Sequence, residues 1–210
     1  MFTAYDSSFA SLAEISVPTM RRYCENHGID FRAFPDPEVE RPRAWAKIPL
    51  AETLFGEGYD FVWWIDADAM FVRFDADFRE QVDPGADFYF VEEPNAIPGT
   101  ESRTRLNSGV FALRNSPIVR EFLRDAWAQE DLVHHEWWDQ AGMIAAFGFR
   151  SMLCRPHHRP DEPVARYADR LRRLPTQWNA GMGLYAVDNP IVVHFMGMAP
   201  AGKRIGMRMA

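Results

Sequence analysis

The amino-acid sequence predicts an α/β fold, and three observations support this prediction. Patterns typical of strands and of helices alternate along the first third of the 210-residue chain. The segment Phe61-Val62-Trp63-Trp64-Ile65 is apolar without alternation, as in a strand buried on both faces of a largely parallel sheet. No linker-like stretch divides the chain, so residues 1–210 are expected to form a single domain with a mixed central sheet.

Each expected element follows from a local pattern. Ser11 and Glu14 have the spacing of a capping box at the start of a helix, and Gly28 marks its end. Ser116-Pro117 is typical of a helix N-terminus. The basic stretch 166–173 is interpreted as a solvated helix face. In chain order, the main expected elements are strand 1–5, helix 11–28, strand 29–33, helix 45–55, strands 61–65, 88–91 and 110–113, helices 117–126 and 139–147, and strands 151–154 and 191–194.

Charge and hydropathy exclude several classes of protein. With 23 basic and 30 acidic residues the formal net charge is −7, which disfavours nucleic acid as a partner. A nucleoside diphosphate is still compatible with this charge, provided that a divalent cation neutralises its phosphates. No segment approaches the roughly 20 apolar residues of a membrane span, and the N-terminus lacks a signal-peptide pattern. A cytoplasmic location is therefore expected, and the sequence does not indicate an oligomeric state.

Two carboxylates stand directly after the apolar segment 61–65. Asp66 and Asp68 are separated by one residue, at a point where a sheet opens into a ligand-binding crevice. Two desolvated carboxylates so close together repel each other unless a cation binds between them. Carboxylate oxygens suit Mg²⁺ or Mn²⁺, and either ion leaves positions open for diphosphate oxygens. This pair is the first candidate site.

The same tripeptide occurs a second time, which provides an internal comparison. Asp75-Ala76-Asp77 follows a polar context rather than a buried strand. We therefore expect the second copy to lie on the surface without a ligand. An isolated Asp-x-Asp tripeptide usually does no more than end a strand.

The first Asp-Ala-Asp copy, residues 66–68, is one part of a series of five sequence blocks that occur in a set order, which makes it more significant than an isolated tripeptide. Together they resemble the GT-A glycosyltransferases, and most closely the galactosyl transferase family 34 of the Gma12/Mnn10 type. The resemblance extends over roughly residues 1–197. The blocks are Trp45-Ala46-Lys47, the string Tyr59 to Phe71 around Asp66 and Asp68, Leu106-Asn107-Ser108-Gly109-Val110-Phe111 with Arg114-Asn115-Ser116, Trp138-Asp139-Gln140, and Val193-His194-Phe195-Met196-Gly197.

The resemblance implies a fold and a reaction. It implies the nucleotide-diphospho-sugar transferase fold, GT-A, and transfer of a hexose or pentose, such as galactose or xylose, from a UDP-sugar. The acceptor would be a glycan or a small molecule, and the anomeric configuration would be retained. Eukaryotic members of family 34 typically carry an N-terminal membrane anchor and stem, which this sequence lacks. Golgi location and glycoprotein substrates are therefore not expected.

The resemblance also implies roles for individual residues. Asp66 and Asp68 would hold the metal, Mn²⁺ or Mg²⁺, with His194 as the third ligand. Gln140 would stabilise an oxocarbenium-like transition state, and Asp139 would orient the donor or the acceptor. Related retaining enzymes have a lysine soon after the His-x-x-Gly block, whereas here Lys203 comes later. The residues expected to bind the donor are Lys47, Asp66, Asn107, Ser108, Gly109, Gly197 and Lys203.

Two functions of other classes also fit an Asp-x-Asp pair at a strand end. A haloacid-dehalogenase-like phosphatase would use the first aspartate as a nucleophile, but such enzymes usually have Thr or Val where Met70 stands here. A non-catalytic nucleotide-sugar binder would keep the metal site without turnover. Hydrolysis of the donor distinguishes a catalyst from a binder.

Overall fold

The computed structural model of the protein describes residues 1–94, 105–153 and 161–210. Within these residues the central sheet has six strands in the order β2-β1-β3-β6-β5-β7. They are β1 (Phe2–Tyr5), β2 (Arg32–Pro35), β3 (Phe61–Ile65), β5 (Phe88–Glu92), β6 (Leu106–Arg114) and β7 (Leu171–Leu174). A smaller sheet, in the order β4-β9-β8, consists of β4 (Ala69–Phe71), β8 (Ala180–Gly181) and β9 (Val192–His194).

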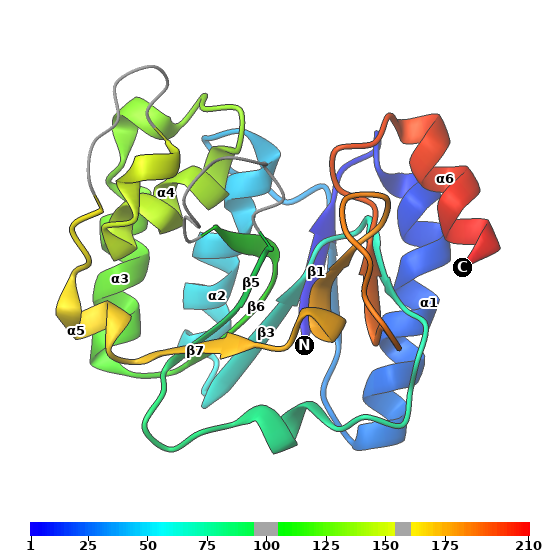
Figure 1. The fold of residues 1–210 in the computed structure, drawn as a ribbon, viewed down its shortest axis with the longest axis horizontal. Helices are drawn as coiled ribbons and strands as arrows, with labels where there is room; N and C mark the ends of the chain where they lie inside the picture. The colour runs from blue at the N-terminus through cyan, green and yellow to red at the C-terminus, as the bar shows by residue number, and fades with distance from the viewer. Residues whose placement is uncertain (95–104, 154–160) are drawn as a thin grey trace.

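Helices lie on both sides of the central sheet. The α-helices are α1 (Ala10–His27), α2 (Lys47–Gly56), α3 (Pro117–Trp127), α4 (Trp138–Phe147), α5 (Ala165–Ala168) and α6 (Pro200–Met209). Short 3₁₀ turns occur at Arg43–Ala46, Phe78–Gln81, Glu130–Leu132, Arg150–Met152 and Thr176–Asn179. Figure 1 shows α2, α3 and α4 on one side of the sheet, and the smaller sheet with α1 and α6 on the other.

The central strands are buried on both faces, as the sequence predicts for β3. Val62 and Trp64 belong to the apolar cluster under α2, α3 and α4. Trp63 and Ile65 point the other way, into the cluster shared with α1 and the smaller sheet. Successive side chains of a strand alternate between faces, so a strand between two apolar layers needs an unbroken apolar run. The helices thus hold β3 rigidly from both sides, and with it the residues that follow.

Strand directions bring distant segments to one edge of the sheet. β1 pairs in parallel with both β2 and β3, whereas β6 runs antiparallel to β3 and β5. The carboxyl ends of β3 and β5 therefore meet the amino end of β6. β7 is parallel to β5, so the turn that follows it reaches the same edge. Residues 66, 93, 107–109 and 179 are brought together in this way.

Several sequence predictions about elements are confirmed. β3 and β6 contain the strands expected at 61–65 and 110–113, and α2 forms the helix expected at 45–55 from Lys47 onward, after the 3₁₀ turn at Arg43–Ala46. Gly28 ends α1 in the left-handed conformation, with φ 62°. Ser116 caps α3 by accepting a hydrogen bond from the Val119 amide. Within the described chain, no helix combines the length and apolar character needed to cross a membrane.

Other predictions are wrong. α1 begins at Ala10, before the expected capping box, and its N-cap residue Phe9 makes no side-chain cap. The Asp6 carboxylate instead accepts hydrogen bonds from the Ser8 and Phe9 amides and orders the approach to the helix. The half-exposed strand lies at Arg32–Pro35 rather than at 29–33, because it pairs with β1 in that register.

The predictions for segments 151–154 and 166–173 are wrong because tertiary contacts, which local sequence patterns do not encode, determine the structure there. The strand expected at 151–154 is a 3₁₀ turn at Arg150–Met152, and residue 154 lies outside the described residues. The basic stretch 166–173 is divided between the end of α5 and the edge strand β7. Arginines of this stretch pair with acidic residues of the neighbouring strand, as in the contact between Arg173 and Glu92.

A close contact fixes the position of α4 against the core. An ideal Cβ on Gly142 would lie 2.5 Å from Cη2 of Trp45 and 3.0 Å from the Ala126 carbonyl oxygen. Trp45 is fully buried and donates a hydrogen bond from Nε1 to the Val133 oxygen at 3.1 Å, so its ring has little freedom to move away. Glycine at 142 therefore sets how closely α4 approaches the Trp45 ring.

Replacing this glycine tests the contact, because two effects of opposite sign compete. Gly142→Ala gains up to about 1 kcal/mol of helix propensity, but overpacking of a rigid core costs typically about 1–3 kcal/mol. We expect a net loss of roughly 1–2 kcal/mol in the free energy of unfolding measured with urea. In Gly56→Ala the same Cβ meets no described atom within 4 Å, so stability should stay equal or rise. A Gly142→Ala protein as stable as the wild type would contradict the contact.

Candidate active site

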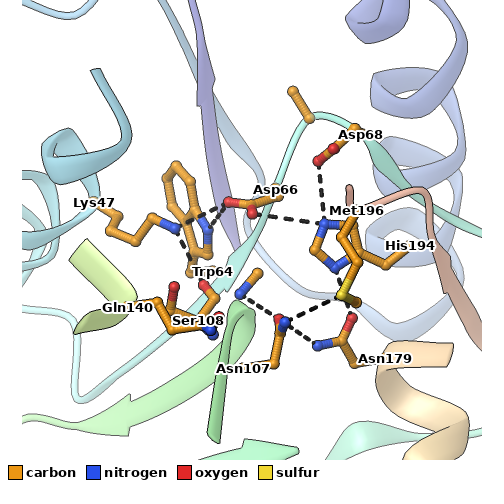
Figure 2. Close-up of polar contacts among 12 residues, drawn as sticks. Lys47, Trp64, Asp66, Asp68, Asn107, Ser108, Gln140, Asn179, His194 and Met196 are labelled. Carbon is orange, nitrogen blue, oxygen red and sulfur yellow. Dashed lines mark hydrogen bonds and ion pairs between the residues drawn. The ribbon is translucent and has the colours of Figure 1, made fainter. Parts of the chain in front are cut away.

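Three potential metal ligands converge just after β3. Nε2 of His194 lies 3.2 Å from Oδ1 of Asp68 and 3.7 Å from Oδ2 of Asp66. One ligand atom from each residue falls within 4.8 Å of the other two. Asp68 and His194 are buried, whereas Asp66 is partly open to solvent. Figure 2 shows Asp66 between His194 on one side and Lys47 on the other.

The topology accounts for this convergence. The amide of Asp66 donates a hydrogen bond to the Gly109 oxygen at 2.8 Å, which extends the β3–β6 ladder by one residue. His194 is the last residue of β9 and lies opposite Ala69 in the antiparallel pairing with β4. Because β4 begins one residue after Asp68, this pairing brings the histidine back to the two carboxylates. Backbone pairing, rather than a flexible loop, thus positions all three side chains.

In each of the two carboxylates, the two oxygens have different interaction partners. Oδ1 of Asp66 accepts hydrogen bonds from Lys47 Nζ at 3.1 Å and Trp64 Nε1 at 2.7 Å, which leaves Oδ2 facing the imidazole. In Asp68, Oδ2 pairs with an ammonium group from α6 and Oδ1 faces the imidazole. Neighbouring ligands of an octahedral Mg²⁺ or Mn²⁺ lie about 3 Å apart. Two carboxylate oxygens and one imidazole nitrogen at these separations fit such an ion.

The ammonium group from α6 belongs to Lys203, which is almost completely buried. Burial disfavours the charged form of Asp68, but His194 and Lys203 outweigh this effect and hold the pKa of that carboxyl well below its usual range. Burial likewise opposes the charge of His194, yet the ion pair with Asp68 raises the pKa of the imidazole. Asp68 is therefore ionised and available as a ligand at neutral pH.

Lys47 lies on the opposite side of Asp66 and is fully enclosed. Its ammonium group is 3.0 Å from Oδ2 of Asp139 and 3.1 Å from Oδ1 of Asp66, and it donates to the Ser108 carbonyl oxygen at 3.2 Å. Burial alone would lower the pKa of Lys47, but the two carboxylates raise it, so the lysine stays charged. All three donor hydrogens thus have partners within the protein.

The residues expected to be catalytic lie beside Ser108. Its amide donates to Oε1 of Gln140 at 3.1 Å, and its hydroxyl donates to Oδ2 of Asp139 at 2.7 Å. Gln140 is partly exposed, whereas Asp139 is buried at the start of α4. The structure therefore brings Asp139, Gln140, Ser108 and Lys47 together around Asp66. Their proposed roles in catalysis and donor binding stay predictions.

Asn107 has a different environment from the one expected of a residue that binds donor hydroxyls. Its Oδ1 accepts hydrogen bonds from the Gly109 amide at 2.7 Å and from Nδ2 of Asn179 at 2.7 Å. Its own Nδ2 donates to Glu93. The side chain is buried and lies within a polar chain that reaches His194. Asn179 and Glu93 are site residues that sequence reasoning missed, because no short motif marks either of them.

The remaining expected donor residues lie after β9. Gly197 is exposed and has φ 70°, a left-handed conformation that glycine adopts without strain. It turns the chain between β9 and α6, and Lys203 follows in α6. Lys203 is therefore near the carboxylates, where it is paired with Asp68 rather than pointing freely into solvent. Contact of Gly197 and Lys203 with a donor diphosphate stays a prediction.

Residues 8–202 match the nucleotide-diphospho-sugar transferase family. The chain belongs to this family. The match contains Lys47, Asp66, Asp68, Ser108, Asp139, Gln140 and His194, whereas Lys203 lies one position beyond its limit.

Proteins similar in sequence include plant glycosyltransferases. The probable glycosyltransferase 7 of Oryza sativa subsp. indica is 35% identical over 113 residues, covering 50% of this chain and 24% of the rice protein. The xyloglucan 6-xylosyltransferase 1 of Arabidopsis thaliana is 27% identical over 213 residues, covering 86% of this chain and 45% of the plant protein. The chain therefore spans less than half the length of these relatives.

Solved structures agree on the fold. A glycosyltransferase involved in glycosylation of the major capsid of PBCV-1 has a TM-score of 0.69 at 14% identity, covering 100% of this chain and 99% of the other. The galactosyltransferase LgtC, in complex with donor and acceptor sugar analogs, has a TM-score of 0.60 at 12% identity, covering 98% and 94%. At these identities the likeness concerns the fold alone, and it confirms the predicted GT-A fold.

Gly109 provides a sharp test of the candidate metal centre. An ideal Cβ at this position would lie 2.1 Å from Cε1 and 2.7 Å from Nδ1 of His194, so the imidazole packs directly against the glycine backbone. The sequence predicts that Gly109 binds the donor, and in the structure the group that packs against this glycine is the histidine ring. The ring is confined on one side by β6 and on the other by its carboxylate partners.

Gly109→Ala should displace His194 and weaken Mn²⁺ binding at least tenfold, because the new methyl group occupies the position of the ring. The measurement is titration of the purified protein with Mn²⁺ followed by electron paramagnetic resonance of the free ion. Gly56→Ala, where the added methyl group has open space, is the matched control and should bind Mn²⁺ as the wild type does. Unchanged affinity in Gly109→Ala would show that His194 is not a ligand.

Proposed function

We propose that this protein is a metal-dependent glycosyltransferase that transfers a hexose or pentose from a UDP-sugar with retention of anomeric configuration. The finer assignment to the Gma12/Mnn10 type, family 34, is part of the proposal and is supported by the five ordered sequence blocks. The xylosyltransferase activity named for the Arabidopsis relative supports a pentose such as xylose among the candidate sugars. The acceptor is proposed to be a glycan or a small molecule.

The observation that carries the proposal is the cluster of Asp66, Asp68 and His194. It lies at the carboxyl end of a central strand, where α/β sheets bind ligands. Its two carboxylates and one imidazole suit Mn²⁺ or Mg²⁺. Membership of the nucleotide-diphospho-sugar transferase family supplies the class of ligand that such a cation would hold.

A divalent cation held by these residues would neutralise the donor diphosphate and stabilise it as a leaving group. The protein groups around it would then bind and orient the donor. Lys47 and Lys203 offset part of the negative charge of the carboxylates from either side, which lowers the repulsion of an anionic donor at this edge. Asp139, held by Lys47 and Ser108, is positioned to orient a sugar hydroxyl by accepting its hydrogen bond.

Gln140 is the group proposed to face the anomeric carbon. The Ser108 amide fixes its side-chain oxygen at 3.1 Å, which orients the amide dipole before any substrate binds. Because a neutral amide is a poor nucleophile, this residue favours same-face departure and attack over a covalent glycosyl-enzyme. In that route the departing diphosphate accepts the proton of the acceptor hydroxyl as the new glycosidic bond forms.

A non-catalytic nucleotide-sugar binder has the same fold and metal site, so turnover is the distinguishing measurement. Donor hydrolysis in the absence of acceptor reports on the catalyst alone. A phosphatase reaction through Asp66 is disfavoured by the family to which the chain belongs, and by the lysine and indole hydrogen bonds that occupy one oxygen of that carboxylate.

The metal-dependent donor site can be tested by thermal unfolding. Mn²⁺ with UDP at about a hundred times its dissociation constant should raise Tm by roughly 5–10 °C, because a ligand of the native state stabilises it by mass action. EDTA should reverse the rise. Asp68→Asn should abolish it, since this residue is buried beside His194.

Asp77→Asn, in the second Asp-Ala-Asp copy, is the matched control. Asp77 caps a short 3₁₀ turn by accepting from the Arg79 amide, and asparagine can make the same cap. The variant should therefore keep the ligand-induced rise in Tm. Equal losses in both variants, or no rise with any nucleotide and metal in the wild type, would refute the proposed site.

The role of Gln140 can be tested by separating turnover from binding. If its amide oxygen stabilises charge that develops at the anomeric carbon, Gln140→Ala should lower kcat by roughly a hundredfold. The donor Kd should change little, because the interaction strengthens only in the transition state. The measurement is donor hydrolysis under saturating donor, together with the donor Kd from calorimetry. A loss explained entirely by weaker donor binding would remove Gln140 from the catalytic residues.

A further inference from the structure

A buried asparagine outside every recognised motif contacts the candidate metal ligand His194. Asn179 is the last residue of the turn Thr176–Asn179 that follows β7, and it is completely buried. Its side-chain oxygen lies 2.9 Å from Nδ1 of His194, and its side-chain nitrogen lies 2.7 Å from Oδ1 of Asn107. Figure 2 shows Asn179 and Asn107 on the side of the imidazole that faces away from Asp66 and Asp68.

The backbone N–H of Gly109 determines which atom is oxygen and which is nitrogen in the side-chain amides of Asn107 and Asn179. The backbone amide of Gly109 can only donate, and it lies 2.7 Å from the Asn107 side chain, so the atom it meets must be the acceptor Oδ1. The nitrogen of Asn107 then faces the carboxylate of Glu93, which can only accept when ionised. The contacts of both side-chain atoms of Asn107 therefore agree on which atom is the oxygen and which is the nitrogen.

The same reasoning extends from Asn107 to the histidine. Because Oδ1 of Asn107 is an acceptor, the atom of Asn179 that faces it must be the donor Nδ2. The acceptor Oδ1 of Asn179 is therefore the atom that faces the imidazole, and Nδ1 of His194 must carry a hydrogen to donate to it. A neutral imidazole with hydrogen on Nδ1 has its lone pair on Nε2.

Nε2 is the nitrogen directed at the two carboxylates, 3.2 Å from Asp68. From these contacts we infer that Asn179 is a positioning residue that, through Asn107 and Glu93, fixes the tautomer and the ring orientation of His194 for metal coordination. This inference rests on the proposed metal-dependent function. In metal-bound histidines, removal of the hydrogen-bond partner of the second ring nitrogen commonly lowers metal affinity by about 10–100-fold.

On the side of the His194 ring that faces away from the carboxylates, the hydrogen bond to Asn179 is the contact that orients the ring. The backbone of Gly109 confines the imidazole face, with the position of a Cβ only 2.7 Å from Nδ1. A ring turned over by 180° would exchange Nδ1 with Cδ2 and Nε2 with Cε1, so it would present a carbon atom to the carboxylates and lose the hydrogen bond to Asn179. The buried amide of Asn179 would then lack its acceptor interaction, which costs the desolvation penalty of a buried polar group.

The test compares two substitutions at position 179 by Mn²⁺ titration. Asn179→Leu keeps the approximate volume but removes the acceptor, and we expect Mn²⁺ affinity to fall by about 10–100-fold. Asn179→Asp keeps an acceptor for the Nδ1 hydrogen, and we expect it to bind Mn²⁺ at least several-fold more tightly than Asn179→Leu. Asn115→Leu is the matched control, because Asn115 also makes hydrogen bonds through its side chain, which are partly buried, but follows the opposite end of β6. Its Mn²⁺ affinity should equal that of the wild type.

A second measurement does not depend on the folding of any variant at position 179. In wild-type protein loaded with Mg²⁺ and labelled with ¹⁵N at histidine, the His194 ring should show a protonated Nδ1 and an unprotonated Nε2. His194→Gln assigns the signals. Observation of the opposite tautomer overturns the inference, and so does Mn²⁺ affinity in Asn179→Leu equal to that of the wild type or of Asn179→Asp. A wild type that binds no Mn²⁺ instead refutes the proposed function itself, so the two failures are distinguishable.

Discussion

The structure of the site depends on how two carboxylates at the end of one buried strand are neutralised. Asp66 and Asp68 follow β3, whose side chains are packed on both faces, so the carboxylates cannot separate by moving the strand. Burial of like charges at this spacing is unfavourable unless positive groups approach them. Lys47, His194 and Lys203 are those groups, and each approaches a different oxygen. These three groups come from α2, β9 and α6.

Close backbone packing makes that arrangement possible. The antiparallel direction of β6 brings its first residues to the ends of β3 and β5, and Gly109 leaves enough room there for the His194 ring. The polar chain from Glu93 through Asn107 and Asn179 occupies the space behind the ring. On the other side of Asp66, Gly142 lets α4 approach Trp45 and brings Asp139 within 3.0 Å of Lys47. A rigid apolar scaffold thus supports a dense polar site.

The sequence predicts the parts of this arrangement that local patterns encode. An apolar run without alternation identifies β3, and two aspartates after it identify the candidate metal centre, to which resemblance adds His194. Pairings that form only in three dimensions are not visible in this way. Residues 171–173 are part of the basic stretch predicted to be a solvated helix face, but they pair with β5 and belong to β7. Asn179 likewise lies in a segment without a motif, and its importance follows only from the 2.9 Å contact with His194.

The ion pair between Lys203 and Asp68 has a consequence for how the protein is made. The two residues are 135 positions apart, and the pair forms beside a histidine that also comes late in the chain. During synthesis on the ribosome, β3 and the aspartates that follow it emerge long before either cationic partner. The core sheet can begin to assemble at that stage, whereas the charge-balanced centre cannot. Its completion therefore requires the segment that contains β9 and α6, so a chain truncated before this segment would lack a finished site.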